Sequence, residues 1–419
     1  MRVHGMISPG KELRLSKILN PEDGKGVIVA ADHGFMLGSI KGVYNLEETL
    51  KKVINGKPDA VLLSPGQASR LSHLFLGKDA PAILIRADWT NAFRTKKYAL
   101  PSRKIVRALA ASAEEALALG ASGIVLYFFI GCSDKSEASN FELLASYAQE
   151  CNRLGLPLII EPIPLGERVT GANYADLIKV SVRMAVEVGA DAIKAPYTGD
   201  VESFRKVVDA AGGVPILILG GAKAGTVRDA LEVVAEALEA GAQGVVYGRQ
   251  VIQAEDPSAF VRSVRAIVHE GKTVDEALGS SLKGHIRLRV KPELCTGCLL
   301  CQLACVFRHE GGFSITNSRL KIKEENIGFF NPSLCLLLSD PAHKPYCIEA
   351  CEVGAISMNE MGGLQLNKDV CVGCRKCVDA CPIGIVAFVE GKPLLCDVCG
   401  GVPECALWCP QGAIRIEGL

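Results

Sequence analysis

The stretch KGVIVAADHG, residues 25–34, is a short apolar run that ends in the polar pair Asp32 and His33. Seven further runs of this kind follow it: DAVLLSPG (59–66), AILIRAD (82–88), SGIVLYFFIG (122–131), LPLIIEPIP (156–164), ADAIKAPYTGD (190–200), VPILILGGAK (214–223) and AQGVVYGRQ (242–250). Strands that are apolar on both faces are typical of a parallel sheet covered by helices. Eight of them predict a closed (β/α)8 barrel, and a doubly wound open sheet is the alternative.

The connecting segments have the spacing of amphipathic helices, as in SRKIVRALAASAEEALALG (102–120) and TVRDALEVVAEALEAGA (226–242). At Gly120, Gly189 and Gly241, such a segment passes into a strand through the dipeptide Gly-Ala. Glycine readily adopts the left-handed conformation that ends many helices. We therefore expect a helix to end at each of these three glycines.

Three charged residues lie at the ends of strands, where barrels of this kind carry their chemistry. Asp32 ends the first strand, Glu161 lies in the fifth and Lys194 lies in the sixth. A lysine amine that is removed from water has a lowered pKa and can form a Schiff base with a carbonyl compound. The alternative is a surface or salt-bridged lysine.

The loops after the last two strands combine glycine with a basic residue. They contain Gly220, Gly221 and Lys223 in one loop and Gly248 and Arg249 in the other. Glycine lets backbone N–H groups approach a phosphate closely, and these loops are the usual phosphate position of a barrel. A phosphorylated sugar or a small carbonyl compound is therefore the expected substrate.

A family resemblance is carried by the segments AADHG, GCSDKSE, IKAPYTGD, LGGAKAGT and YGRQVIQAEDPSAFVRSVRAIVHEG, in this order. On these motifs, residues 10–275 resemble the archaeal-type class I aldolases, which include fructose-bisphosphate aldolase and aminodideoxyheptulosonate synthase. The resemblance implies Lys194 as the Schiff-base lysine, Asp32 as an acid/base residue and the two glycine loops as phosphate binders. The family's catalytic tyrosine belongs to a YPRG segment, where this chain has Ile163 and Leu165 in place of Tyr and Arg.

Glu161 precedes Ile163 by two residues and therefore lies on the same face of the strand. A carboxylate at this place can transfer protons instead of the absent tyrosine. A glutamate that is simply paired with a nearby lysine is the alternative interpretation.

The last third of the chain is rich in cysteine, since 15 of the 17 cysteines lie between Cys295 and Cys409. CTGCLLCQLAC (295–305) and CVGCRKCVDACP (371–382) share the spacing C-x2-C-x2-C-x3-C. Three thiolates at this spacing bind one [4Fe–4S] cluster and the fourth binds a neighbouring cluster. A zinc site is the alternative, but zinc needs only two close pairs of ligands.

Two less regular groups complete the set. CDVCGGVPECALWCP (396–410) supplies Cys396, Cys399, Cys405 and Cys409, and CLLLSDPAHKPYCIEAC (335–351) supplies Cys335, Cys347 and Cys351. Leu338 stands where a further cysteine would complete the second group. Residues 285–419 resemble the four-cluster electron-transfer subunits of tungsten and molybdenum oxidoreductases, and CDVCGGVPEC resembles those that serve aldehyde oxidoreductases.

In that family the first motif shares ligands with the fourth, and the second shares ligands with the third. The resemblance implies three [4Fe–4S] sites with the ligand sets Cys295, Cys298, Cys301 and Cys409; Cys396, Cys399, Cys405 and Cys305; and Cys371, Cys374, Cys377 and Cys351. It leaves Cys335, Cys347 and Cys381 for a [3Fe–4S] cluster, or for a [4Fe–4S] cluster with one ligand that is not cysteine. His343 is a candidate for that ligand, and a solvated loop histidine is the alternative.

The polar joint DEALGSSLKGH (275–285) marks the domain boundary. We predict an aldolase-like barrel over residues 1–280 and a small α+β domain, like a bacterial ferredoxin, over residues 281–419. The segments GGLQLN (362–367), VAFVEGKPLL (386–395) and GAIRIEGL (412–419) are expected to form small hairpins around the clusters.

The 46 basic and 46 acidic residues leave no net charge that would attract nucleic acid or anionic lipid. No apolar run approaches the roughly 18 residues of a membrane span, and the first residues lack the apolar core of a signal peptide. We therefore expect a cytoplasmic protein. No motif for an organic cofactor is evident.

These features favour a bifunctional protein, a Schiff-base aldolase fused to an electron carrier that docks to an aldehyde-oxidising partner. That partner is expected to be a tungsten or molybdenum aldehyde oxidoreductase, and the chain is expected to be oligomeric. The first alternative is an electron-transfer subunit whose inactive barrel is a docking scaffold. The second is an aldolase in which the clusters are structural or sense redox state.

Overall fold

The computed structural model describes residues 8–95, 98–220, 227–254, 256–281, 286–340, 343–359 and 361–416. The chain forms two compact units. The first consists of Met1–Ala224 with Asp229–Val274, and the second of Gly225–Arg228 with Asp275–Leu419. The predicted boundary between residues 280 and 281 falls within helix α12 (Val274–Ser281).

The first unit contains a closed barrel of eight parallel strands, as the apolar runs predict. The strands are β1 (Gly26–Ala30), β2 (Ala60–Leu63), β3 (Ala82–Arg86), β6 (Gly123–Ile130), β7 (Leu158–Pro164), β8 (Ala192–Pro196), β9 (Ile216–Leu219) and β10 (Gly244–Tyr247). Their order around the barrel is β1-β10-β9-β8-β7-β6-β3-β2, and the pairing of Gly26 with Gly244 and of Ile28 with Ala60 joins β1 to both of its neighbours.

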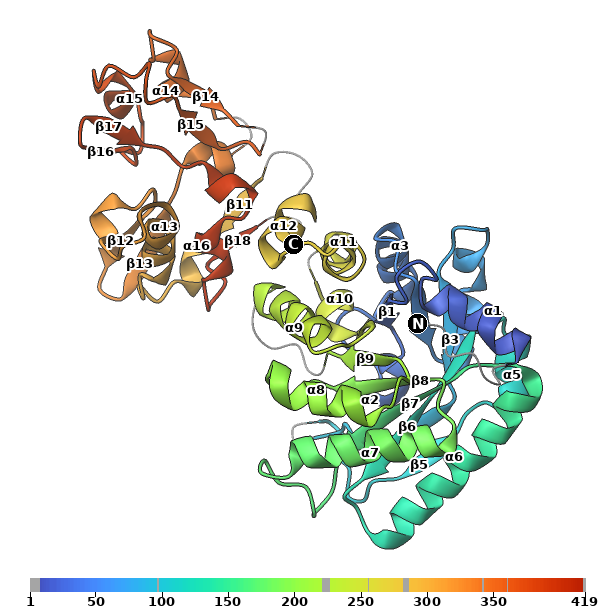
Figure 1. Cartoon of the computed structure of the whole chain (residues 1–419). Coiled ribbons are helices and arrows are strands. Elements are labelled where there is room, and N and C mark those ends of the chain that lie inside the picture. The colour runs from blue at the N-terminus through green and yellow to red at the C-terminus, as the bar shows by residue number, and fades with distance from the viewer. Residues whose placement is uncertain are drawn as a thin grey trace. The chain divides into compact units, whose positions relative to one another are not determined.

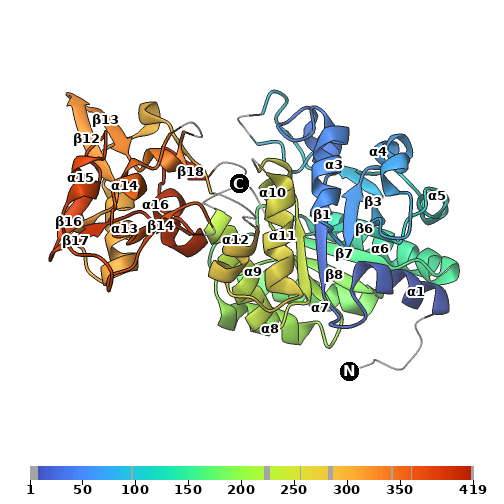
Figure 2. The same ribbon diagram turned by 90° about the horizontal axis from the view of Figure 1, so that it is seen from above.

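Helices surround the strands, as Figures 1 and 2 show. They are α1 (Pro9–Ile18), α2 (His33–Leu37), α3 (Leu46–Asn55), α4 (Pro65–Arg70), the 3-10 helix η1 (Ser72–Phe75), α5 (Ala113–Ala118), α6 (Asp134–Leu154), α7 (Tyr174–Val188), α8 (Val201–Ala210), α9 (Val227–Glu239), α10 (Arg249–Ile252) and α11 (Pro257–Val268). Gly120, Gly189 and Gly241 have φ of +78°, +102° and +106°, which confirms the predicted left-handed helix ends.

The prediction of one helix over residues 102–120 is wrong in its first half. Arg107–Leu109 forms β5, which pairs antiparallel with β4 (Asp88–Thr90), and the helix begins only at Ala113. Ser112 sets this start, because its side chain and that of Glu115 form a reciprocal capping box. The segment before Ser112 is therefore free to form a hairpin beside the barrel mouth.

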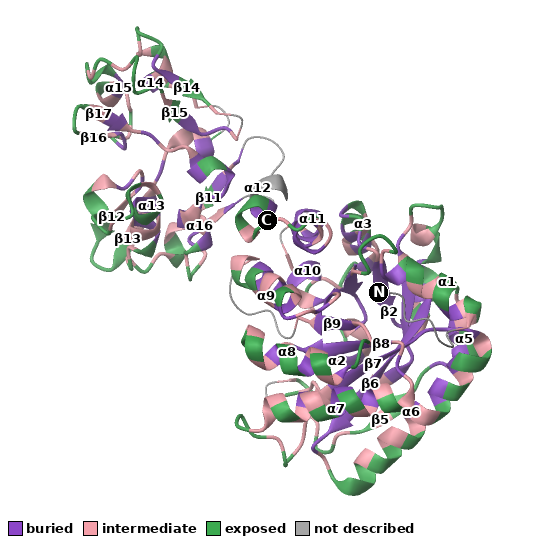
Figure 3. Ribbon diagram, viewed as in Figure 1, coloured by how far each residue is buried: buried purple, intermediate pink, exposed green. Residues whose placement is uncertain are grey.

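The barrel interior is filled by apolar side chains from all eight strands, and nearly all residues of the strands are buried, as Figure 3 shows. Ile18 and Leu19, at the end of α1, belong to the same cluster. Lys11 of α1 forms an ion pair with Asp191, which lies just before β8, at 2.6 Å. Helix α1 therefore packs against the amino-terminal end of the barrel and leaves the carboxyl end for chemistry.

The second unit consists of two-stranded antiparallel sheets and short helices. The strands are β11 (Leu288–Val290), β12 (Lys321–Asn326), β13 (Phe329–Ser333), β14 (Ile356–Met358), β15 (Leu364–Leu366), β16 (Ala387–Val389), β17 (Lys392–Leu394) and β18 (Ile414–Ile416). The helices are α12, η2 (Pro292–Leu294), α13 (Leu300–Glu310), η3 (Ile315–Asn317), η4 (Leu336–Leu338), α14 (Tyr346–Glu349), α15 (Lys376–Asp379), η5 (Val398–Gly401) and α16 (Glu404–Leu407).

The predicted hairpins are only partly correct. β16 pairs with β17 as expected, and β15 pairs with β14. The strand in GAIRIEGL does not form a local hairpin, because β18 pairs with β11 from the start of the unit. Within the described part of the chain, no helix combines the length and the apolar composition that a membrane span requires.

Candidate functional site

A cavity opens at the carboxyl end of the barrel. It encloses about 600 Å³ of empty space, part of it open to solvent. Charged, apolar and glycine residues line it, among them Asp32, His33, Met36, Leu37, Phe93, Tyr127, Glu161, Ile163, Lys194, Gly220, Gly248 and Arg249. Asp32, Glu161 and Lys194, which are far apart in the sequence, are therefore brought together in one cavity.

Lys194 and Glu161 form the centre of this cavity. β7 and β8 are neighbours, and Ile160 of β7 pairs with Ile193 of β8. The residues that follow them, Glu161 and Lys194, therefore lie side by side. The Nζ atom of Lys194 is 3.0 Å from Oε1 of Glu161, and only 8% and 6% of the two side chains are exposed. The pairing that was weighed as an alternative role for Glu161 is thus present, and it joins the carboxylate directly to the candidate nucleophile.

Arg86, at the end of β3, lies beside this pair and is completely buried. Its guanidinium donates to Oδ2 of Asp32 at 2.9 Å and to Oε2 of Glu161, and its Cζ lies 3.9 Å from the centre of the Tyr127 ring. Burial opposes the charge of Arg86, but Tyr127 and the surrounding carboxylates outweigh burial and raise its pKa well above the ordinary value. Arg86 is therefore a permanent cation that joins Asp32 to Glu161.

The electrostatics differ for Asp32 and His33. Burial raises the pKa of Asp32, but Arg86, His33 and Lys194 outweigh burial and hold that pKa below its ordinary value. Burial lowers the pKa of His33 despite the nearby Asp32. At neutral pH the site therefore contains an ionised Asp32 and a neutral His33.

Arg86→Met should destabilise the barrel, because it leaves Asp32 without its main cation, and breaking a buried ion pair costs about 3–5 kcal/mol. The lowered pKa of Asp32 contributes stability above its ordinary pKa, and this contribution disappears as the pH falls. The loss in thermal midpoint, followed by circular dichroism, should therefore be the same at pH 7 and pH 5 and should become smaller only as the pH falls below 3.8, the ordinary pKa of an aspartate. Arg153→Met is the control, because Arg153 pairs with Glu114 on the surface, where such pairs contribute little. Equal losses in the two variants would contradict the ionic role of Arg86.

The opposite part of the cavity can accept an anion. The Nε atom of Arg249 is buried and has no hydrogen-bond partner among the described residues, and burial lowers the pKa of Arg249. An added Cβ at Gly248 would lie 2.2 Å from Cε1 of His33, so glycine here leaves room for the His33 ring. Gly220 lines the same side of the cavity. The candidate residues Gly221 and Lys223 lie outside the described residues.

Arg86, Asp88 and Tyr127 are site residues that the sequence analysis missed. Asp88 accepts hydrogen bonds from the backbone N–H of Tyr127 at 2.9 Å and from Arg107 at 2.7 Å, so it fixes the strand that carries Tyr127. The charges of Arg86 and Asp88 in AILIRAD could have indicated this site, because a charge inside an otherwise apolar strand needs a buried partner.

In the second unit, the first two C-x2-C-x2-C loops have the same backbone conformation. Gly297 and Leu299 have φ of +69° and +63°, and Gly373 and Arg375, at the equivalent positions, have φ of +70° and +66°. Left-handed residues in such loops turn backbone N–H groups toward one side, which forms the anion-binding concavity found at many iron–sulfur sites. The strained conformation of Leu299 and Arg375 is consistent with loops that wrap around a bound group.

Most of the candidate cluster cysteines line three cavities. The first is lined by Cys295, Cys298, Cys301 and Cys409, the second by Cys351, Cys371, Cys374 and Cys377, and the third by Cys335, Cys347, Cys381 and His343. The Sγ atoms of Cys351 and Cys409 each accept a backbone N–H, from Ala355 and Ala413, at 3.2 Å. Converging thiols with N–H donors to sulfur fit iron–sulfur clusters.

The remaining four cysteines also lie close together. Burial raises the pKa of the Cys405 thiol well above its ordinary value, and the thiols of Cys396, Cys399 and Cys305 raise it further. These are the four cysteines that the three cavities leave over. They form a fourth group of thiols that can hold a metal centre.

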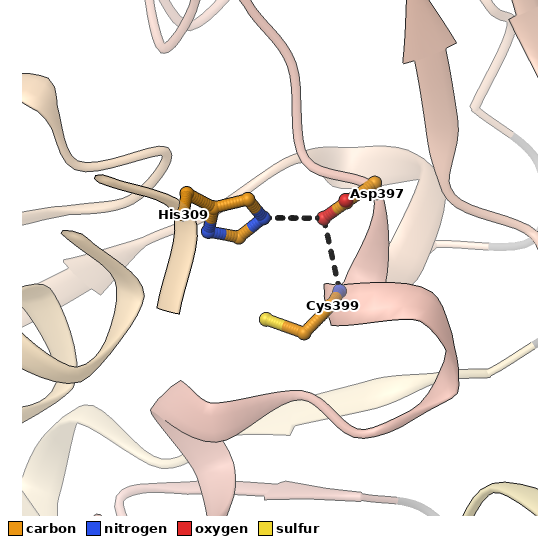
Figure 4. A group of neighbouring side chains, drawn as sticks. All are labelled: His309, Asp397 and Cys399. Carbon is orange, nitrogen blue, oxygen red and sulfur yellow. Dashed lines mark hydrogen bonds and ion pairs between the residues drawn. The ribbon is translucent and has the colours of Figure 1, made fainter. Parts of the chain in front are cut away.

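His309 and Asp397, which the sequence analysis did not single out, lie beside this fourth group. Nε2 of His309 is 2.8 Å from Oδ1 of Asp397, and the same oxygen accepts the backbone N–H of Cys399 at 2.9 Å, as Figure 4 shows. Nδ1 of His309 lies 2.8 Å from the carbonyl oxygen of Cys305. This bridge ties α13 to the loop of η5 and holds Cys305 and Cys399 in place.

The closed parallel barrel, with a buried lysine paired to a carboxylate at its carboxyl end, defines a Schiff-base lyase of the class I aldolase type. Residues 26–254 match the DeoC/LacD family of aldolases, and the chain belongs to this family. An uncharacterized aldolase of Saccharolobus solfataricus is 34% identical over 271 residues, which are 64% of this chain and 98% of that protein. A 2-amino-3,7-dideoxy-D-threo-hept-6-ulosonate synthase of Halobacterium salinarum is 34% identical and covers 65% of this chain and 97% of its own.

Among solved structures, an archaeal fructose-1,6-bisphosphate aldolase with its catalytic lysine covalently bound to a carbinolamine intermediate is similar to the barrel. It has 30% sequence identity and a TM-score of 0.53, and it covers 62% of this chain and 99% of its own. Residues 345–385 match a 4Fe–4S dicluster domain. The chain is therefore a class I aldolase barrel followed by a ferredoxin-like 4Fe–4S domain.

Proposed function

We propose that the barrel cleaves or forms a carbon–carbon bond of a phosphorylated ketose through a Schiff base on Lys194. The observation that carries this proposal is the 3.0 Å contact between Nζ of Lys194 and Oε1 of Glu161 inside a buried cavity. An amine attacks a carbonyl only as the free base, and Glu161 is placed to take the proton of Lys194. The protonated carboxyl then returns this proton to the carbinolamine hydroxyl, which leaves as water.

Cleavage needs a second proton transfer. As the C–C bond breaks, the proton of the substrate hydroxyl moves to a base, the aldehyde departs and the electron pair enters the enamine on Lys194. Protonation of the enamine carbon and hydrolysis then release the ketone. Asp32 is the weaker candidate for the base by position, because Glu161 contacts Lys194 directly at 3.0 Å, whereas the hydrogen bond of Asp32 goes to Arg86. Glu161 remains as the proposed acid/base residue.

Solvent exchange tests this proposal. With dihydroxyacetone phosphate in D₂O and a chelator present, the protein should exchange a proton next to the carbonyl, which is followed by NMR. Formation of the enamine removes this proton, and its return from D₂O replaces it with deuterium, even when no aldehyde is present. If dihydroxyacetone phosphate, hydroxyacetone and pyruvate all remain unexchanged, the barrel is a docking scaffold and the chain is an electron-transfer subunit.

We further propose that the second unit carries electrons to or from an aldehyde-oxidising partner in the cytoplasm. Iron–sulfur clusters take up and release single electrons when bound. Retro-aldol cleavage supplies an aldehyde, and its oxidation with water to a carboxylate releases two electrons and three protons. The four groups of thiols support a relay, and the N–H donors to Cys351 and Cys409 are of the kind that tunes cluster potentials.

Anaerobically purified protein should contain four clusters, three with four cysteines and one with three. Iron should then amount to about 15 or 16 atoms per chain, according to whether the three-cysteine site holds three or four irons. Elemental analysis checks this count. Stoichiometric zinc with little iron would overturn the cluster assignment.

His343 is the proposed fourth ligand of the three-cysteine site. It lines the cavity with Cys335, Cys347 and Cys381, whereas Leu338, at the position of the absent cysteine, offers no ligand atom. His343→Ala should convert this centre to a [3Fe–4S] cluster, which gives a new EPR signal in the oxidised protein. Wild-type protein that already shows a full 3Fe signal would make His343 an ordinary loop residue.

A further inference from the structure

The cavity of the barrel has one apolar side. Met36 and Leu37 of α2, Phe93, Tyr127 of β6 and Ile163 of β7 line it, and they are called the apolar wall below. The wall continues into a larger cluster that includes Trp89, Phe129 and Leu165. Most of this surface therefore offers carbon atoms and no charge to a bound molecule.

Phe93 and Tyr127 of the apolar wall lie across the barrel from the anion-binding side, whereas Met36 and Leu37 follow β1, the neighbour of β10. In the closed order of strands, β3, which leads into Phe93, is four strands away from β9, which leads into Gly220. β6, which carries Tyr127, is likewise four strands away from β10, which leads into Arg249. Lys194 on β8 lies between these two sides. A molecule held by its anionic end at Arg249, with its carbonyl at Lys194, would extend toward the apolar wall.

The apolar wall is already formed in the structure. The Tyr127 ring stacks on Phe129 with 5.3 Å between ring centres and contacts Phe93 at 5.5 Å. Two hydrogen bonds to α2 hold the loop after β4 in place, from Arg94 to the carbonyl oxygen of Met36 at 3.1 Å and from Tyr98 to that of Leu37 at 2.5 Å. No rearrangement is needed before an apolar group can bind.

From this arrangement we infer that the aldehyde handled by the barrel is apolar and carries no phosphate, while the ketone partner carries the anionic group. The inference rests on the proposed Schiff-base function and names its substrate class. A hydroxylated or phosphorylated chain would lose water at the wall, where the hydroxyl of Tyr127 is the one polar side-chain group that could replace it. An apolar chain gains affinity there, since one methylene in an apolar pocket changes specificity by about 10- to 200-fold.

The reaction remains balanced with this substrate. In cleavage, the bond between the carbon next to the imine and the carbinol carbon breaks, and its electron pair enters the enamine on Lys194. The hydroxyl proton moves to Glu161, and the carbinol carbon leaves as the apolar aldehyde. Condensation follows the same steps in reverse.

Acceptor competition tests the inference. The intact protein receives dihydroxyacetone phosphate as donor and either 3-phenylpropanal or glyceraldehyde 3-phosphate as acceptor, and kcat/KM is measured for each. We expect 3-phenylpropanal to be preferred by about tenfold or more. An equal or higher kcat/KM for glyceraldehyde 3-phosphate overturns the inference.

A variant locates the preference. Ile163→Thr places a hydroxyl in the apolar wall and keeps a branched residue suited to a strand, so the preference for 3-phenylpropanal should fall at least severalfold. Val180→Thr is the matched control, because Val180 is 46% exposed on α7. Its ratio of kcat/KM for 3-phenylpropanal to kcat/KM for glyceraldehyde 3-phosphate should equal that of the wild type. Equal ratios in Ile163→Thr and the control would contradict the role of the wall.

Failure of the inference can be told apart from failure of the Schiff-base proposal. If borohydride traps dihydroxyacetone phosphate on Lys194 but 3-phenylpropanal does not condense, only the inference is overturned. If no adduct forms with any donor, the proposed function itself is wrong and the inference is wrong with it.

Discussion

Lys194→Met abolishes aldol turnover and solvent exchange if the barrel works through a Schiff base, because no other lysine among the described residues lines the cavity. Methionine keeps the unbranched length of lysine and should preserve the packing in the barrel. The loss should reach the detection limit in both assays. Turnover that survives the substitution would assign the reaction to another mechanism.

Lys11→Met is the matched control for Lys194→Met. Lys11 is also buried and also paired with a carboxylate, Asp191 at 2.6 Å, but this pair lies at the amino-terminal end of the barrel. Lys11→Met is expected to lower stability and to retain exchange and turnover in the folded fraction. If both variants lose activity in proportion to their stability, the effect of Lys194 is structural.

Glu161→Gln should slow turnover by a factor of about 10² to 10⁴, which is the usual contribution of a general acid/base residue. Glutamine keeps the shape of glutamate but cannot accept the proton of Lys194 or of the substrate hydroxyl. The variant should still form an adduct that borohydride can trap, but more slowly than the wild type, because Lys194 is present and must lose its proton without the help of Glu161. Single-turnover kinetics of cleavage provide the measurement.

Asp32→Asn separates the two carboxylates that contact Arg86. Asp32 accepts from Nε and Glu161 from Nη2, so both substitutions disturb the same cation. We expect the slower cleavage in Glu161→Gln. Full activity in Glu161→Gln together with its loss in Asp32→Asn would assign the proton transfer to Asp32.

The barrel could be predicted from the sequence because each strand is a local pattern, a short run that is apolar on both faces and bounded by turn residues. Arg86 could not be placed in the same way. One charge in AILIRAD indicates that a partner exists, but the partners Asp32 and Glu161 lie just after β1 and on β7, and only the closed order of strands brings them together. The hairpin of β4 and β5 was missed for a similar reason, since the helical spacing of residues 102–120 gave no information on its pairing with Asp88–Thr90.

The cysteine ligands show the same difference between features that follow from local sequence and contacts between residues far apart in the sequence. The spacing in residues 295–301 predicts three thiols on one side of a loop, because it depends only on local backbone geometry. The arrival of Cys409 in the same cavity depends on the packing of α16 and β18 against α13 and β11, which no local pattern encodes. This grouping was predicted only from the resemblance to a known family. His309 and Asp397 are 88 residues apart, and no sequence pattern around either residue predicts their contact.

Borohydride reduction tests the central claim most directly. Wild-type protein is reduced in the presence of dihydroxyacetone phosphate, and the peptides are then mapped by mass spectrometry. The account predicts a stable covalent addition on the peptide that contains Lys194, and no addition there in Lys194→Met. An unchanged mass across dihydroxyacetone phosphate, hydroxyacetone and pyruvate, or an addition on a different lysine, would contradict it.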